Sequence, residues 1–139
     1  MAEDPRLLRI VELLLSLTEA QRIEWQAVGT LNNPRYATSF ADSSFVVYSK
    51  DADGMLPFVV ELRNDRGEVL ESIRSKSMRP RLRRQFTESE EAEREEIREY
   101  NKKFQDLYNR ARRNAMNVDH FLDGVLAELE EQGRQAKGE

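Results

Sequence analysis

The chain has 139 residues, of which 39% are hydrophobic and 35% are charged, and its formal net charge is −4. This length suits one domain with a single core, and the negative charge provides no overall attraction to nucleic acid or anionic lipid. The sequence contains no cysteine, which excludes disulfides, thiolate metal ligands and cysteine nucleophiles. The leucine-rich run at 7–17 is interrupted by Arg9 and Glu12. It therefore predicts an amphipathic helix in a cytoplasmic protein, with no signal sequence and no membrane span.

A helix is predicted over residues 1–20. Asp4 is a good N-cap, and Pro5 suits the first helical position, where its missing N–H is not needed. Apolar residues then recur at helical spacing in a stripe that is wider than one contact face requires. Its members are Leu7, Leu8, Ile10, Val11, Leu13, Leu14, Leu15 and Leu17. We therefore expect this helix to be buried on two sides, against a sheet and against another helix or a second subunit.

Residues 22–74 are typical of a β-meander. The first strand places Ile23, Trp25 and Ala27 on one face, and runs rich in aromatic or β-branched residues follow at 35–40, 45–49, 57–63 and 68–73. Short clusters of Asn, Asp, Ser and Gly separate these runs. Because connections this short join antiparallel neighbours, the sequence predicts five antiparallel strands in chain order.

The last third of the chain is predicted to be helical. A basic linker at 75–86, with Pro80 in its middle, leads to Thr87 and Glu90, whose spacing is that of a capping box. Asn117 can cap or kink the helix that follows. We expect a single α+β domain over 1–132, with the helical part at 87–132 packing on one sheet face, and a disordered tail at 133–139. The expected core includes Leu14, Trp25, Phe45, Val60, Phe121 and Leu122.

Part of the hydrophobic placement resembles that of a loose group of small bacterial proteins. The segments that carry the resemblance are Leu13-Leu14, Leu17-Thr18, Ile23-Glu24-Trp25, Leu107-Tyr108, Ala111-Arg112-Arg113 and Val118-Asp119. The resemblance implies a leucine-rich helix, a meander opened by Ile-x-Trp and a closing helix. That group has no agreed activity, so no catalytic residue is carried over. Some of its members lie near mobile elements or defence loci, which implies an accessory role.

The sequence favours a protein that is not an enzyme, without catalytic residues, metal ligands or a cofactor. His120 has no second histidine or cysteine to join it, and a capping or surface role suits it better than a triad or a metal site. The Asp51-Ala52-Asp53-Gly54 segment departs from the EF-hand spacing and suits a hairpin turn. Trp25 is expected in the core, although a small-molecule sensor binding near Trp25 and Tyr36 is a third, less supported function.

A reversal of charge between 74 and 99 gives the strongest indication of a partner. A cationic stretch is followed by the acidic start of the C-terminal helix at 88–99. The cations can neutralise those glutamates, bind a protein, or bind the phosphates of a nucleic acid. The candidate partner-binding residues are Arg74, Lys76, Arg79, Arg81, Arg83, Arg84, Tyr100, Phe104 and Tyr108. The leading prediction is a non-catalytic bacterial interaction or adaptor protein that self-associates as a homodimer or binds another protein; the alternative is a nucleic-acid accessory factor.

Overall fold

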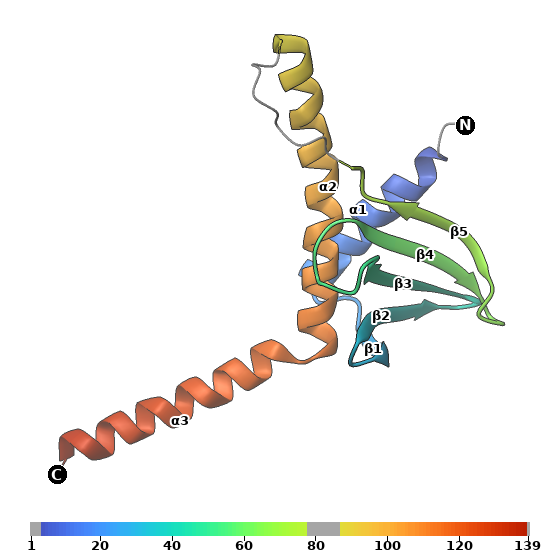
Figure 1. The fold of residues 1–139 in the computed structure, drawn as a ribbon. Coiled ribbons are helices and arrows are strands. Elements are labelled where there is room, and N and C mark those ends of the chain that lie inside the picture. Colours follow the sequence, from blue (N-terminus) through green and yellow to red (C-terminus); the bar gives the residue numbers. More distant parts are fainter. Residues whose placement is uncertain (1–3, 78–86, 139) are drawn as a thin grey trace.

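The computed structural model describes residues 4–77 and 87–138. In chain order its elements are α1 (Pro5–Glu19), β1 (Gln26–Thr30), β2 (Asn33–Phe40), β3 (Ser43–Ser49), β4 (Phe58–Asn64), β5 (Val69–Arg74), α2 (Glu88–Ala115) and α3 (Val118–Gly138). Helices α1 and α2 pack together on one side of the sheet, and α3 extends away from them (Figure 1). The predicted α+β class is therefore confirmed. Below, α1, the sheet and α2 are together called the body.

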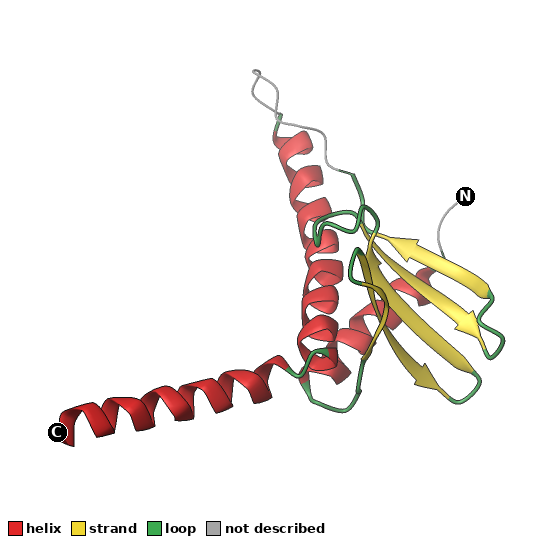
Figure 2. Ribbon diagram, turned by 60° about the horizontal axis from the view of Figure 1, so that its bottom comes forward, coloured by secondary structure: helices red, strands yellow, loops and turns green. Residues whose placement is uncertain are grey.

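The sheet is the predicted five-stranded antiparallel meander, with the strands in the order β1-β2-β3-β4-β5 (Figure 2). Tight turns join neighbouring strands, as between β4 and β5, where the Gly67 N–H donates to the Asn64 carbonyl at 3.0 Å and Gly67 has a φ of 81°. That left-handed conformation favours glycine. The first strand begins at Gln26, so Ile23 and Trp25 are buried just before it, and Ala27 is exposed.

The strand register divides the sheet into a helix-facing side and an outer side. Tyr36 pairs with Val47, Val47 with Val60, and Val60 with Ile73, and all four side chains are buried in the main core. Because successive side chains alternate between faces, the neighbouring row of Arg35, Tyr48, Val59 and Arg74 lies on the outer side.

Helix α1 begins as predicted and packs against α2 and the sheet. The Asp4 carboxylate accepts a hydrogen bond from the Arg6 backbone N–H at 3.0 Å, and Pro5 occupies the first turn. Val11 and Leu14 lie in the core, where they meet α2 and the sheet. Leu13 and Leu17 are exposed on the opposite side. Helix α1 therefore packs against both predicted neighbours, the sheet and another helix, and only Leu13 and Leu17 of its wide stripe are left exposed.

Helix α2 supplies the centre of the core and lies across β1 to β4. Phe104, Leu107 and Ala111 are completely buried, and the Tyr108 ring stacks on Phe58 with ring centroids 4.8 Å apart. These residues recur on one face of the helix at the spacing that an amphipathic helix requires. The core assignments of Leu14, Trp25 and Val60 are confirmed, and Phe45 is half-buried against the same cluster.

Two predictions about the C-terminal helices are wrong: the partner-surface residues of α2 are buried, and the core residues of α3 are exposed. Phe104 and Tyr108 were expected at a partner surface, and both lie inside the core. Phe121 and Leu122 were expected in the core, and both are more than half exposed on α3. The physical reason is that α2 alone crosses the sheet, whereas the chain turns away from the body at the end of α2 (Figure 1).

The caps of the C-terminal helices follow the sequence closely. The Thr87 hydroxyl accepts from the Glu90 backbone N–H at 3.2 Å at the start of α2. Asn117 has a φ of 55°, a left-handed conformation that asparagine adopts more readily than most residues, and it separates α2 from α3. Helix α3 continues to Gly138, through nearly all of the segment that was expected to be disordered.

Candidate interaction surface

The basic segment is described only at its beginning. Arg74 and Lys76 are described, whereas Arg79, Arg81, Arg83 and Arg84 lie outside the described residues. The backbone of Lys76 is fastened to α2: its N–H donates to the Asn101 side-chain oxygen at 2.7 Å, and its carbonyl accepts from the Asn101 amide at 2.8 Å. The Lys76 ammonium lies 4.4 Å from the centre of the Tyr100 ring. Lys76 thus contributes to the attachment of this segment to the body.

The three aromatic residues proposed for partner binding face the body. Tyr100 is half-buried, with its ring centroid 5.1 Å from that of Phe104, and its hydroxyl lies 3.5 Å from the Arg74 carbonyl oxygen. Burial raises the pKa of Tyr108, to which the neighbouring Tyr36 adds a smaller effect. Phe104 is completely buried. A partner approaching α2 therefore meets little of these three rings.

Other residues that resembled chemical sites have structural roles. The indole N–H of Trp25 donates to the Thr18 hydroxyl at 2.9 Å, inside the core. The Asp53 carboxylate accepts from the Met55 backbone N–H and from the Ser49 hydroxyl, which together lower the pKa of Asp53. His120 is exposed beside the Phe121 ring. Among residues 4–77 and 87–138, no three His, Asp or Glu side chains converge as a metal site.

A polar network on the outer face of the sheet was missed by sequence reasoning. The Tyr48 hydroxyl donates to Glu61 at 2.8 Å, and the Arg63 guanidinium lies 2.6 Å from the other oxygen of the same carboxylate. The Arg35 guanidinium covers the Tyr48 ring at 3.9 Å. Burial and, second, the bond to Glu61 raise the pKa of Tyr48. Val46 and Val59 are buried on the same face. The network joins side chains of β2, β3 and β4, so recognising it requires the register across three strands.

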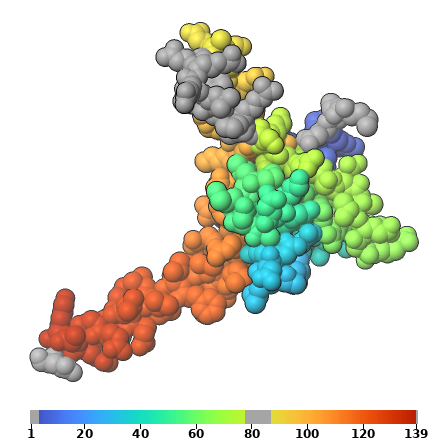
Figure 3. Space-filling model, viewed as in Figure 1, coloured from blue at the N-terminus to red at the C-terminus, as the bar shows by residue number. Residues whose placement is uncertain are grey.

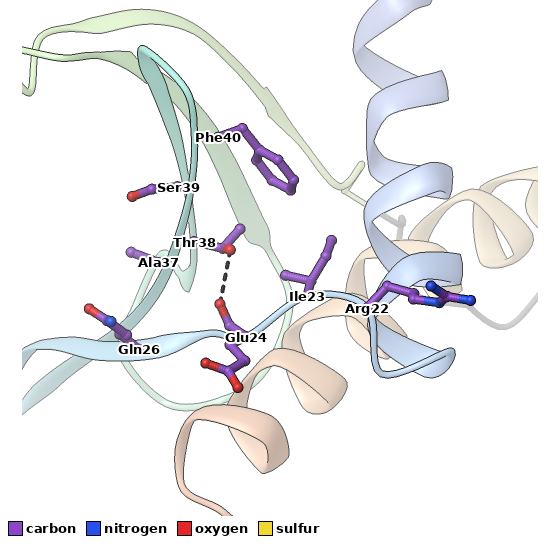
Figure 4. A pocket seen from close by; sticks show the side chains of 8 residues that line it. All are labelled: Arg22, Ile23, Glu24, Gln26, Ala37, Thr38, Ser39 and Phe40. Atoms are coloured by element: carbon purple, nitrogen blue, oxygen red, sulfur yellow. Dashed lines mark hydrogen bonds between the residues drawn. The ribbon is translucent and has the colours of Figure 1, made fainter.

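One hollow on the body lacks a convergent set of charged groups. It has a volume of about 310 Å³ and lies where the chain leaves α1 and enters β1, beside the end of β2. In Figure 4 the Thr38 hydroxyl donates to the Glu24 carbonyl, and the Arg22 side chain points away from the other side chains drawn. The charged groups of Arg22 and Glu24 therefore do not converge on one point, and the hollow has no arrangement suited to catalysis.

Helix α3 carries a stripe of apolar side chains that are exposed to solvent. None of the residues of Val118–Gly138 is buried in the structure, although this helix is fully described. Five of its large apolar residues are between 53 and 65% exposed. We define the α3 stripe as Phe121, Leu122, Val125, Leu126 and Leu129. A helical apolar face of this kind is normally buried against another element.

The shape of the stripe suits contact with another helix. A hollow of about 330 Å³ opens beside Gly124 and is lined by Phe121, Val125 and Leu129 along with polar neighbours. A Cβ added at Gly124 would meet no other atom within 4 Å, so the hollow is open there. The stripe therefore combines protruding side chains with a recess, as helix-to-helix packing requires.

The α2–α3 corner holds the stripe clear of the body. The Arg113 guanidinium lies 2.5 Å from the Asp119 carboxylate across the corner, and the Phe121 N–H donates to the Asn117 carbonyl at 3.2 Å. In Figure 3, α3 forms an arm that projects from the rest of the molecule. Its main contacts with the body are with α2. No residue of the arm is buried, and the side chains of the α3 stripe are more than half exposed.

Comparisons with known proteins give no identification, because no family model, curated protein or solved structure matches the chain. Over the described parts of the chain, none of the three helices has the length and apolar character that crossing a membrane requires.

Proposed function

We propose that this chain is a non-catalytic interaction or adaptor protein of the cytoplasm and that α3 is its binding element. The observation that carries the proposal is the α3 stripe, which presents five large apolar side chains to solvent on a helix without a buried residue. Contiguous exposed apolar surface usually marks an interaction site. An isolated helix is also marginal in water, because helices in proteins are stabilised mainly by packing an apolar face. Burial of the stripe against a partner would remove this apolar surface from water and would stabilise the helix.

The body supports this assignment because its apolar rows are already covered. The helix-facing row of the sheet packs against α1 and α2, and the outer face carries the network of Arg35, Tyr48, Glu61 and Arg63. A helix laid in an apolar groove is a recurring mode of recognition, with contacts at i, i+3, i+4 and i+7. Leu122, Val125, Leu126 and Leu129 follow that spacing.

The test compares the full chain with charge insertions on two faces of α3. Leu122→Glu and Leu126→Glu place a carboxylate within the stripe, and Ala127→Glu places the same charge on the opposite face. All three side chains are exposed, so the body should fold in each variant. We expect the stripe variants to lose association with any copurifying protein or second copy, and the Ala127→Glu control to retain it. Association that is equal in all four proteins would refute the assignment to α3.

The resemblance to small bacterial proteins supports a narrower proposal, that the chain is an accessory factor of a defence or mobile-element locus. A constant gene neighbour that encodes a protein bound through the α3 stripe would support this role. Neighbouring genes that differ from genome to genome would contradict it.

A second candidate function is binding of nucleic-acid phosphates, favoured by the position of Arg74. This residue lies in the outer-face row that also contains Arg35, at the point where the basic segment begins. Fluorescence anisotropy with short DNA and RNA over a salt series would test it. Binding that weakens steeply with salt and is lost on Arg74→Ala with Arg35→Ala would support this candidate. Binding that is absent at low salt would eliminate it.

A further inference from the structure

The edge of β2 that faces β1 is covered only in part. Pairing between the two strands ends at Gln26 and Ala37, whereas β2 continues to Phe40. Among the described strands, only β3 therefore lies beside Ser39. We propose that the gap beside Ser39 binds an extended peptide of a partner protein, which adds to the sheet as a short strand. The inference goes beyond the proposed function of α3, because it assigns a second and separate binding site to the body.

The strand register directs the backbone N–H and carbonyl of Ser39 into the gap. In an antiparallel ladder, successive residues of a strand turn these groups toward opposite neighbours. Phe40 and Ser43 flank a two-residue turn and form the hydrogen-bonded pair that closes it, so Phe40 turns toward β3. Pro34 has no N–H to donate, and it lies opposite Gly29 of β1, as this alternation requires. Ser39 therefore turns toward β1 and offers one donor and one acceptor in strand geometry, which is what an added strand recognises.

Two hydrogen bonds hold the chain that precedes β1 away from Ser39. A continuation of the β1 register would place Glu24 opposite Ser39. The Glu24 carbonyl instead accepts from the Thr38 hydroxyl at 2.9 Å. The Trp25 backbone N–H donates to the Asn114 side chain of α2 at 2.6 Å. Because closing the gap would break these bonds and draw Trp25 out of the core, the gap is a fixed feature of the fold.

The hollow of about 310 Å³ beside the end of β2 lies in this gap and has an apolar side. The Phe40 ring and the Ile23 side chain point toward one another across it, whereas Ser39 points to the other side of β2 (Figure 4). Because side chains alternate along a strand, the peptide residue opposite Ser39 points outward and the next one points between Phe40 and Ile23. The site therefore favours an extended backbone with an apolar side chain at that next position. The Arg22 side chain points away, so the peptide needs no acidic residue.

Titration of the full chain with a peptide, followed by NMR of the backbone amides, tests the site. The probe is a pentapeptide of alternating threonine and valine with blocked ends, and its matched control has aspartate in place of valine. We expect saturable shifts at the amides of Ile23, Ser39 and Phe40 with the valine peptide and none with the aspartate peptide. The absence of saturable shifts at millimolar peptide would overturn the site. Shifts confined to α3 would also overturn it, and would leave the proposed function of the α3 stripe intact.

Substitutions in β2 separate the backbone from the side chains. Ser39→Pro removes the donor that faces the gap and leaves the bonds between β2 and β3 in place, so the dissociation constant of the valine peptide should rise about tenfold. Ser39→Ala keeps both backbone groups and should change it less than about twofold. Phe40→Glu places a charge beside the apolar side chain of the peptide and should also weaken binding about tenfold, which keeps the test decisive if Ser39→Pro does not fold. Unchanged affinity in either weakened variant, once its amide spectrum shows a folded chain, would overturn the proposal.

Discussion

The clearest test of the body concerns Asn101, whose side chain joins α2 to the end of the sheet. Asn101 is only 3% exposed. Its oxygen accepts from the Lys76 backbone N–H at 2.7 Å, and its amide donates to the Lys76 carbonyl at 2.8 Å. The side chain therefore satisfies both backbone groups of Lys76, as a neighbouring strand would. Replacement by alanine removes both hydrogen bonds and leaves an apolar methyl group in their place.

The expected loss is about 1–3 kcal/mol in the free energy of unfolding. Each hydrogen bond contributes about 0.5–1.5 kcal/mol net, and a buried group left unpaired costs more. Because Lys76 is itself exposed, water can reach its backbone in the variant, so the loss stays within this range. Urea denaturation followed by fluorescence of Trp25, the lone tryptophan, measures it. Lys102→Ala is the control, because it removes an exposed side chain next in sequence and should change stability by less than about 0.5 kcal/mol.

The Asn101→Asp variant separates the effect of the hydrogen bonds on stability from the effect of side-chain volume, because Asp and Asn have nearly the same size. The new carboxylate can accept from the Lys76 N–H but faces the Lys76 carbonyl oxygen, so burial and that oxygen raise its pKa in the folded state. A raised folded-state pKa gives stability that is fully present below the unfolded value of about 3.9 and is lost as pH rises through the folded pKa. The free energy of unfolding of Asn101→Asp should therefore fall well below that of the unmodified chain at pH 7, and the difference should become smaller toward pH 4. An alanine variant within 0.5 kcal/mol of the unmodified chain, or an aspartate deficit independent of pH, would refute this reasoning.

Three further predictions address the ends of α1 and the independence of α3. Thr18→Val leaves the Trp25 indole N–H without its partner and should reduce stability by about 1–3 kcal/mol, with Thr18→Ser retaining most of it in the same urea assay; equal losses would contradict the hydrogen-bond explanation. Hydrogen bonds from Arg6 lower the pKa of Asp4 to about 2, so NMR titration should show its midpoint rise toward 3.8 in Arg6→Ala, and an unchanged midpoint would refute the pairing. The capping contribution of Asp4 should accordingly be lost as pH falls from about 4 to 2, since a depressed folded pKa stabilises only above it. A chain ending at Asn117 lacks α3 and should still fold, with the melting temperature that the full chain has at low protein concentration. Its melting temperature should not depend on protein concentration. If that dependence persists, the self-association does not involve α3.

The meander was predictable because its determinants are local. Alternating apolar residues define each strand, and clusters such as Asn64, Asp65 and Gly67 define each turn, so neighbouring strands must pair in chain order. The caps at Asp4 and Thr87 were recognisable for the same reason. The beginning of β1 was harder to predict. Ile23 and Trp25 precede the first paired residue, Gln26, and they are buried by tertiary contacts rather than by strand pairing.

The candidate surface was less predictable because an apolar stripe specifies burial but not the surface that covers it. Phe104 on α2 and Phe121 on α3 belong to stripes of the same period. Only the path of the chain at Asn117 places the first against the sheet and the second in solvent. The Tyr48, Glu61 and Arg63 network was missed for a related reason, since it depends on pairing between separate strands.

The capacity of the sheet explains why α3 has no place on its own body. Helix α2 lies across β1 to β4, and α1 packs against α2 and β5, so the helix-facing side of all five strands is covered. Helices α1 and α2 pack side by side there, so a third helix on this face would have to displace one of them. The outer face presents ion-paired Glu61 and Arg63, whose half-buried charges an apolar stripe would desolvate at a cost. Because neither face of the sheet has room for an apolar helix, burial of the α3 stripe requires a surface other than the sheet, which is why we assign α3 to the binding of a partner.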